Sequence, residues 1–231
     1  MKSSYFPAGI FIAAASVSGC SPDNSAEARS VAVSSAAPAA QIAPEATTSP
    51  AAAHLFVTAA AGNSARYRIR EQLVKVDLPN DAVGVTSGVT GVIATDAKGN
   101  IIPGESKFTV DVTTLKSDRD RRDGFVQKRV LETDKYPTVT FVPTAVRGVS
   151  LPLPKSGTKA LEVDGNLTVR DQTHPVTWKV TARFDASGVS GSAATAFTFA
   201  SFAIDQPRVP VVLSVGDTIK LEMDFSMIPK K

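Results

Sequence analysis

The sequence has little of the chemistry that enzymes and metalloproteins use most often. Its 231 residues include one cysteine, Cys20, and two histidines, His54 and His174. A single cysteine excludes an intrachain disulfide. Two histidines far apart in the sequence, with no second cysteine, leave too few ligands for a metal site. We therefore expect neither a metal nor a disulfide.

Catalytic motifs are also absent. The chain has no Gly-x-Ser-x-Gly, no phosphate-binding glycine loop and no His-Glu-x-x-His. Arg122-Asp123 could form an acid–base pair, but both lie in a densely charged segment, where a structural ion pair or a helix-start contact is more common. His174 has no chemical partner nearby in sequence. We predict no catalytic residues, and an esterase or isomerase ranks well below a binding protein.

Charge of one sign is not concentrated anywhere. The 25 basic and 22 acidic residues are intermixed and give a formal net charge of +3. Nucleic-acid-binding proteins normally show a stripe or patch of clustered Lys and Arg. We therefore do not expect nucleic acid as a partner.

The N-terminus resembles an export signal. Lys2 precedes an apolar run at 10–15 that is too short to span a bilayer but suits a signal peptide. The following Val-Ser-Gly-Cys string resembles the lipobox of bacterial lipoproteins. This resemblance implies a signal peptide over 1–19, cleavage before Cys20 and lipidation of Cys20. Ser21 in place of Asp implies sorting to the outer membrane. The alternative is a plain secretory signal with a chance cysteine.

Residues 20–62 are rich in Ala, Pro and Ser and have few large side chains. Such a segment cannot bury enough apolar surface to offset its chain entropy. We interpret it as a disordered tether, with His54–Val57 as an apolar patch that could contact the domain. The folded domain is then expected over 63–231.

The clearest structural signal is a predicted hairpin. Alternate residues are apolar over 161–169 and again over 178–184. This period of two is typical of strands with one face in an apolar interior. The polar segment 171–175, which ends in Pro175, is predicted to be the connecting turn. The inward face contains no acid, base or nucleophile.

Similar patterns recur along the domain and predict an all-β fold. About eight strands and one short helix, over 117–134, are expected, and both a sandwich and a barrel fit the pattern. The strands are predicted at 67–78, 83–95, 107–113, 138–146, 161–169, 178–184, 189–204 and 219–226.

Several strings together resemble the YceI family of bacterial lipid-binding proteins. They are Arg122-Asp123, Leu131–Phe141 (LETDKYPTVTF), Val163–Val169 (VDGNLTV), His174-Pro175-Val176 and Val215-Gly216-Asp217. The resemblance implies an eight-stranded antiparallel lipocalin-like barrel with a short helical insertion. It also implies a periplasmic location and an apolar lumen that takes an isoprenoid chain, such as a quinone tail or a polyprenyl lipid. The basic residues near 66–75 depart from the family pattern, so the head group is the least transferable part.

Ten apolar residues are predicted to face the lumen. Pattern alone favours a filled core, and only the family resemblance favours a container. The leading hypothesis is non-catalytic binding, storage or transport of an isoprenoid amphiphile by a lipoprotein anchored to the outer membrane, with no cofactor besides that lipid or quinone. The alternative is a tethered structural or interaction domain without a ligand, and a homodimer is left open. The ten residues are Phe108, Val110, Phe141, Leu167, Trp178, Val180, Phe197, Phe199, Leu221 and Phe225.

Overall fold

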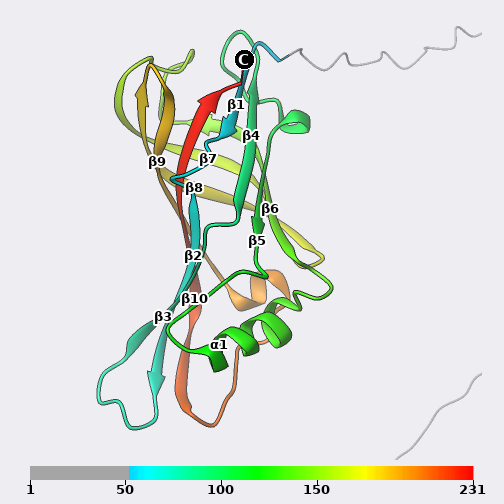
Figure 1. The fold of residues 1–231 in the computed structure, drawn as a ribbon, viewed down its shortest axis with the longest axis vertical. Coiled ribbons are helices and arrows are strands. Elements are labelled where there is room, and N and C mark those ends of the chain that lie inside the picture. The colour runs from blue at the N-terminus through cyan, green and yellow to red at the C-terminus, as the bar shows by residue number, and fades with distance from the viewer. Residues whose placement is uncertain (1–51, 231) are drawn as a thin grey trace, which may run out of the picture. The chain divides into compact units, whose positions relative to one another are not determined.

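The computed structural model describes residues 52–230, most of which form strands of one antiparallel sheet (Figure 1). Short helical segments connect some of the strands. The elements are β1 His54–Thr58, β2 Ser64–Leu73, β3 Asn80–Thr86, β4 Val89–Thr95, η1 Pro103–Glu105, β5 Lys107–Asp111, α1 Asp120–Phe125, η2 Val126–Leu131, β6 Thr138–Arg147, β7 Gly157–Val169, β8 Gln172–Asp185, β9 Gly188–Thr198, η3 Phe199–Phe202 and β10 Val212–Pro229.

Eight strands close into a barrel. They pair in the order β1, β4, β5, β6, β7, β8, β9 and β10, and β10 pairs back to β1. The closing ladder joins Phe56–Thr58 to Met227–Pro229. The lipocalin-like barrel with a short helical insertion is therefore confirmed.

The two ends of the barrel are built differently. Only the last residues of β10 pair with β1. The earlier part of β10 pairs with β2, which in turn pairs with β3. The free edge of β3 is joined to the segment that follows β5 by an isolated β-bridge between Val85 and Lys116. α1 lies toward this end, which we call the helix end, whereas β1 and the C-terminus lie toward the other, the closed end (Figure 1).

Strand β1 corrects the domain boundary expected from the sequence. It lies within 20–62, the segment assigned to a tether, and hydrogen-bonds to both β4 and β10. Composition misled here because the strand is only five residues long and follows an Ala-rich stretch. The barrel thus begins by His54 rather than at residue 63. The predicted signal peptide, Cys20 and the rest of the predicted tether up to residue 51 lie outside the described residues.

The β7–β8 hairpin has the predicted alternation of buried and exposed residues, but its turn is shorter than predicted. Strand β8 already begins at Gln172, and Arg170, at a φ of +57°, sits in the tight turn before it. Pro175 is therefore inside a strand, opposite Asn166 of β7. β9 pairs with β8 only from Lys179 onward. Pro175 is tolerated because no strand lies on its other side to require an N–H donor.

The predicted strand 189–204 ends early. β9 stops at Thr198, and Phe199–Phe202 form the 3₁₀-helix η3, which ends at Ala203 with a φ of +50°. Because the backbone changes from strand to helix at Phe199, the side chains of Phe202 and Ile204 do not continue the alternation that includes Phe197. A helical turn brings Phe199, Phe202 and Ile204 all into the interior.

Candidate functional site

The barrel interior contains two cavities with apolar walls. The larger has a volume of about 160 Å³ and reaches the helix end, where η2 and the loop 203–211 line it. The smaller, about 100 Å³, lies toward the closed end beside the β4–β5 connection. An apolar cavity of roughly 150 Å³ stays dry and can hold a benzene-sized group. Each cavity therefore has room for a short apolar segment of a ligand.

All ten residues predicted to face the lumen line one or both cavities. Whether they bind a ligand is a prediction that the geometry alone does not test. The larger cavity is lined by Phe108, Val110, Phe141, Leu167, Trp178, Phe197, Phe199 and Leu221. The smaller is lined by Phe108, Phe141, Trp178, Val180 and Phe225.

Other lining residues were missed from the sequence. Tyr67 and Ile69 alternate with arginines on β2, so a period-two count could have found them. Val126 and Val130 showed helical spacing, but nothing in that spacing says that the helix closes a barrel. Met223 follows the regular alternation of β10 and lines both cavities.

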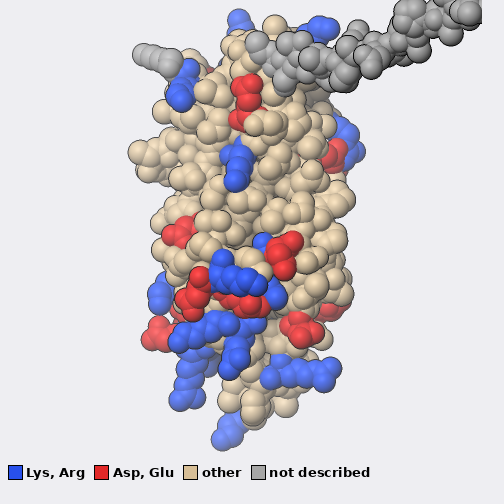
Figure 2. All heavy atoms as spheres, turned by 90° about the vertical axis from the view of Figure 1, so that its right-hand side faces the viewer, with Lys and Arg blue, Asp and Glu red and all other residues tan. Residues whose placement is uncertain are grey.

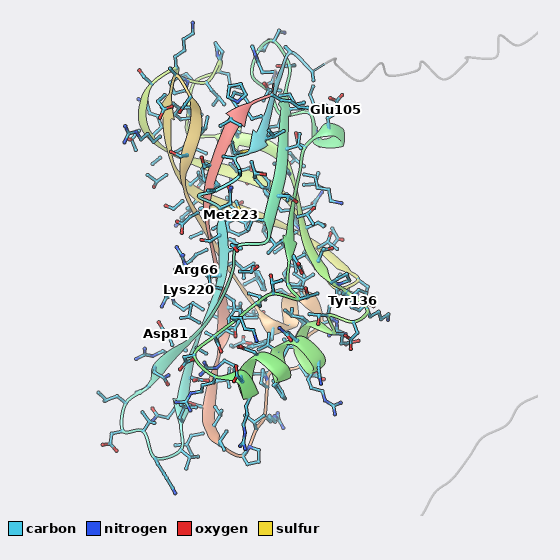
Figure 3. All side chains as sticks on the ribbon, in the orientation of Figure 1. Arg66, Asp81, Glu105, Tyr136, Lys220 and Met223 are labelled. Carbon is cyan, nitrogen blue, oxygen red and sulfur yellow. The ribbon has the colours of Figure 1, made fainter. Side chains whose placement is uncertain are left out.

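A partition separates the two cavities. Four side chains line both of them, namely Phe108, Phe141, Trp178 and Met223. The rings of Phe141 and Trp178 meet edge to face, with centroids 5.8 Å apart. The indole N–H of Trp178 is buried without a hydrogen-bond partner among the described residues. Met223 lies about midway along the barrel (Figure 3). A ligand longer than one cavity would have to displace these side chains.

Glycines make room for aromatic rings along the barrel wall. Gly91 on β4 is paired with Phe108 on β5, and a Cβ at Gly91 would lie 2.3 Å from the Phe108 ring. A Cβ at Gly165 would lie 2.5 Å from the ring of Phe141, and one at Gly84 would lie 2.2 Å from the ring of Tyr67. The rings therefore occupy the space above glycines on neighbouring strands. Gly91 pairs in register within the β4–β5 ladder, so its lack of a side chain serves the packing of the Phe108 ring.

Segment 120–131, which comprises α1 and η2 and which we call the cover, forms part of the cavity wall at the helix end. Val126, Val130 and Leu131 of η2 line the larger cavity. η2 has the wider turn of a π-helix, a rare form that is frequent at functional sites. The cover thus turns its apolar side toward the cavity rather than toward a packed core.

Polar contacts hold the cover in place. The Arg122 guanidinium donates to Glu71 of β2 and to Asp118. The Arg122 and Glu71 side chains are only 12% and 8% exposed. Buried Asp123 accepts hydrogen bonds from the Ser117 N–H and hydroxyl at 2.8 and 2.6 Å. The Arg122 guanidinium also donates to the Ser117 hydroxyl at 3.4 Å, so Arg122 and Asp123 belong to one hydrogen-bond network that anchors the cover, which fits the structural role favoured from the sequence.

Tyr67 places a hydroxyl near this polar cluster. Burial raises the pKa of Tyr67 to about 12; the nearby carboxylates add to the shift and Arg122 opposes it. The phenol is therefore neutral at physiological pH. Tyr67 also lines the larger cavity, so it is a polar group within reach of a ligand head group.

The basic residues of β2 have an outer-surface role. Arg66 pairs with Glu222 and Asp224 at 2.8 and 2.9 Å, and Arg68 and Arg70 both reach Asp81. Figure 3 places Arg66 and Asp81 along this part of the sheet. Three of the basic residues noted in the sequence are thus paired with carboxylates of β3 and β10.

The described part of the chain offers little for catalysis. Within 52–230, no group of three or more His, Cys, Asp or Glu side chains is arranged to hold a metal ion. His174 lies at the helix end, with its ring 5.2 Å from that of Phe202. Gln206 donates to the Val215 carbonyl, which is a loop contact. In the same range, no helix has the length and apolar character needed to cross a bilayer.

Solved structures with a similar fold are available. A polyisoprenoid binding domain from Saccharophagus degradans, described as implicated in plant cell wall breakdown, matches with a TM-score of 0.59 at 10% identity; the match covers 76% of this chain and 98% of that domain. BcnA of Burkholderia cenocepacia matches with a TM-score of 0.51 at 18% identity, covering 70% of this chain and 94% of BcnA. At these identities the likeness shows the fold alone.

Sequence comparison identifies the family. A UPF0312 protein of Pseudomonas putida strain GB-1 is 32% identical over 138 residues, which cover 56% of this chain and 66% of the relative. The chain thus spans just under two thirds of that relative's length. The family model of the YceI-like domain matches residues 57–227. This match covers nearly all of the barrel, and the chain belongs to the YceI-like domain family.

Proposed function

We propose that this protein binds an amphiphile with an isoprenoid tail, such as a quinone or a polyprenyl lipid, in its barrel lumen and stores or carries it without catalysis. The observation that carries the proposal is a closed barrel containing two apolar-walled cavities that share four lining side chains. A lipid-binding role also fits the family and the description of the Saccharophagus degradans domain as polyisoprenoid binding.

The affinity would come mainly from burial of the tail. Each methylene moved out of water contributes about 0.8 kcal/mol before ordering costs. The larger cavity is close in size to one that holds a benzene-sized group. A tail of several isoprene units would therefore need both cavities and displacement of the partition. Affinity should rise with chain length until both cavities are filled.

Purified protein offers the most direct test. Lipids extracted from it and identified by mass spectrometry should include a polyprenyl compound. Geranylgeraniol titrated into the delipidated protein should shift the fluorescence of Trp178, the only tryptophan in the chain. An absence of co-purifying lipid together with no spectral response to any prenyl lipid would favour the filled-core alternative.

A glycine substitution tests the lumen without deleting apolar surface. Gly91→Ala should push the Phe108 ring toward both cavities and weaken binding of geranylgeraniol by about four- to fifteenfold, because one or two methylenes are excluded at about 0.8 kcal/mol each. Gly104→Ala is the matched control, since a Cβ there meets nothing within 4 Å. Equal affinities of the two variants would argue against a ligand in the lumen.

The cellular location is part of the proposal. We infer a periplasmic protein anchored to the outer membrane through acylated Cys20, on the strength of the signal-like N-terminus. Metabolic labelling with a palmitate analogue should mark the wild-type protein and leave Cys20→Ser unlabelled. Equal labelling of both would overturn the assignment of Cys20.

A further inference from the structure

Large apolar side chains are exposed at the helix end. Of the eight large hydrophobic residues with high exposure within 52–230, five lie in two segments, the β2–β3 connection and the start of β10. Leu78, Leu213 and Val211 are 75%, 67% and 63% exposed, and Val74 and Val76 are each 40% exposed. These five residues are called the apolar tip. Apolar exposure gathered in one place marks an interaction site more often than scattered single residues do.

The tip is an ordered structure. The Val74 N–H donates to the Val211 carbonyl at 3.0 Å and joins its two segments. The Gln72 amide donates to the Val76 carbonyl, and Lys75 has a φ of +66° in the turn. The backbone is thus held in a turn that directs its valines and Leu78 outward.

The tip is linked directly to the cavity. The loop 203–211 carries Ile204 and Pro207 on the wall of the larger cavity and ends in Val211 of the tip. The loops that carry the tip extend beyond α1 at this end of the barrel (Figure 1). Whatever covers the tip therefore lies next to the cavity wall.

The surface beside the tip carries more positive than negative charge. Over 116–131 the exposed charged side chains are five bases and two acids, Asp118 and Asp120. Within or next to the tip, the exposed bases Lys75 and Arg208 are balanced by the exposed acids Asp77 and Asp205, so the excess of positive charge comes from 116–131. Figure 2 shows Lys and Arg side chains gathered toward this end of the visible face. The five bases, which lie on the cover and just before it and which we call the basic surface of the cover, are Lys116, Arg119, Arg121, Lys128 and Arg129.

We propose that the apolar tip and the basic surface of the cover dock onto an anionic phospholipid bilayer. The tip would enter the interface while the basic side chains contact lipid phosphates, a combination typical of peripheral membrane binding. The proposal rests on the proposed function, since docking would bring the cavity wall to the surface from which an isoprenoid lipid is taken.

Vesicle co-sedimentation tests the proposal. The chain from Ser21 to Lys231 keeps every strand of the barrel and lacks Cys20, so no acyl anchor contributes. We expect it to bind phosphatidylglycerol vesicles more tightly than phosphatidylcholine vesicles, and more weakly at high salt. Leu78→Asp and Leu213→Asp should each weaken binding by about tenfold, the factor equivalent to 1.4 kcal/mol.

The control lies at the closed end. Ile228 is exposed at the end of β10, and Ile228→Asp should leave vesicle binding unchanged. The proposal is overturned if the tip variants bind vesicles like the wild type, or if Ile228→Asp weakens binding equally. It is also overturned if sedimentation velocity shows a dimer that Leu78→Asp dissociates while vesicles stay unbound, because the tip would then be a self-association surface.

A separate readout keeps this proposal distinct from the lumen. Geranylgeraniol added from ethanol, with Trp178 fluorescence as the signal, should bind the tip variants with wild-type affinity. Vesicle binding without any prenyl response would leave the docking surface standing and refute the proposed ligand. A prenyl response without vesicle binding would refute the docking surface and leave the proposed ligand standing.

Discussion

Two helical segments meet the interior at the same end of the barrel, and they are held in opposite ways. In η3 the rings of Phe199 and Phe202 are buried, and a capping box between Thr198 and Ser201 fixes its start. In the cover, the only buried side chain is the carboxylate of Asp123. Its apolar residues are half-buried and face a cavity, and its firm contacts are hydrogen bonds and ion pairs.

The difference indicates which segment can move. Displacing η3 would expose two phenylalanine rings to water, at a cost of several kcal/mol. Displacing the cover would break polar contacts that water can largely replace, and would open the larger cavity. η3 therefore belongs to the core, whereas the cover is the part of the wall that could yield to a ligand.

The largest loss of stability should come from a substitution in η3. Phe202 is 1% exposed and lines neither cavity, so Phe202→Ala should lower the free energy of unfolding by about 3–5 kcal/mol. Trp178→Ala should cost less in the ligand-free protein, because the ring already borders both cavities. Urea unfolding of the delipidated variants provides the measurement. Equal losses would indicate that Trp178 lies in a filled core.

A smaller effect is expected at the cover. Arg122→Met removes the partner of buried Glu71 and should cost about 2 kcal/mol. Hydrogen exchange should accelerate over 117–131 while η3 keeps its protection. The double variant Glu71→Gln with Arg122→Met should recover part of the loss, since no charge is left unpaired. Uniform acceleration across the barrel would contradict a separately held cover.

The smallest loss of stability should come from lowering the pH. The pKa of Asp118 is lowered; burial opposes the shift, and the Arg122 hydrogen bond and charge produce it. Because the folded pKa lies below the unfolded value near 3.8, this contact stabilises the cover above that pH and is lost as the pH falls through the folded pKa. The protection of amides over 117–131, relative to their intrinsic exchange rates, should therefore fall below about pH 4. Asp118→Asn should flatten this response, whereas an unchanged pH dependence in that variant would assign it to another group.

The sequence predicted those parts of the fold that follow a simple period. Strands β7, β8 and β10 alternate regularly, so five of the ten predicted lumen residues could be assigned from their inward faces. The other five lie on β5, β6 and β9 and in η3. The barrel itself came from the family resemblance, because alternation fits a sandwich equally well.

The remaining features depend on tertiary contacts. β1 is too short to stand out, yet it closes the ring through partners far away in the sequence. η3 interrupts a run with strand-like composition because its phenylalanines reach the interior from a helical turn. The roles of Gly91 and Gly165 depend on which aromatic ring lies across from each, and that is set by strand register.

The position of β1 determines how far the barrel can lie from an attachment point at Cys20. His54 begins β1 toward the closed end, away from the apolar tip (Figure 1). Strand β10, with 18 residues, runs roughly 60 Å between these ends. The chain from Cys20 to His54 can span at most roughly 115 Å. If Cys20 is acylated as proposed, a segment of this contour length would permit the barrel to turn its tip toward the membrane, whereas a segment of half that length would be too short to reach past the barrel.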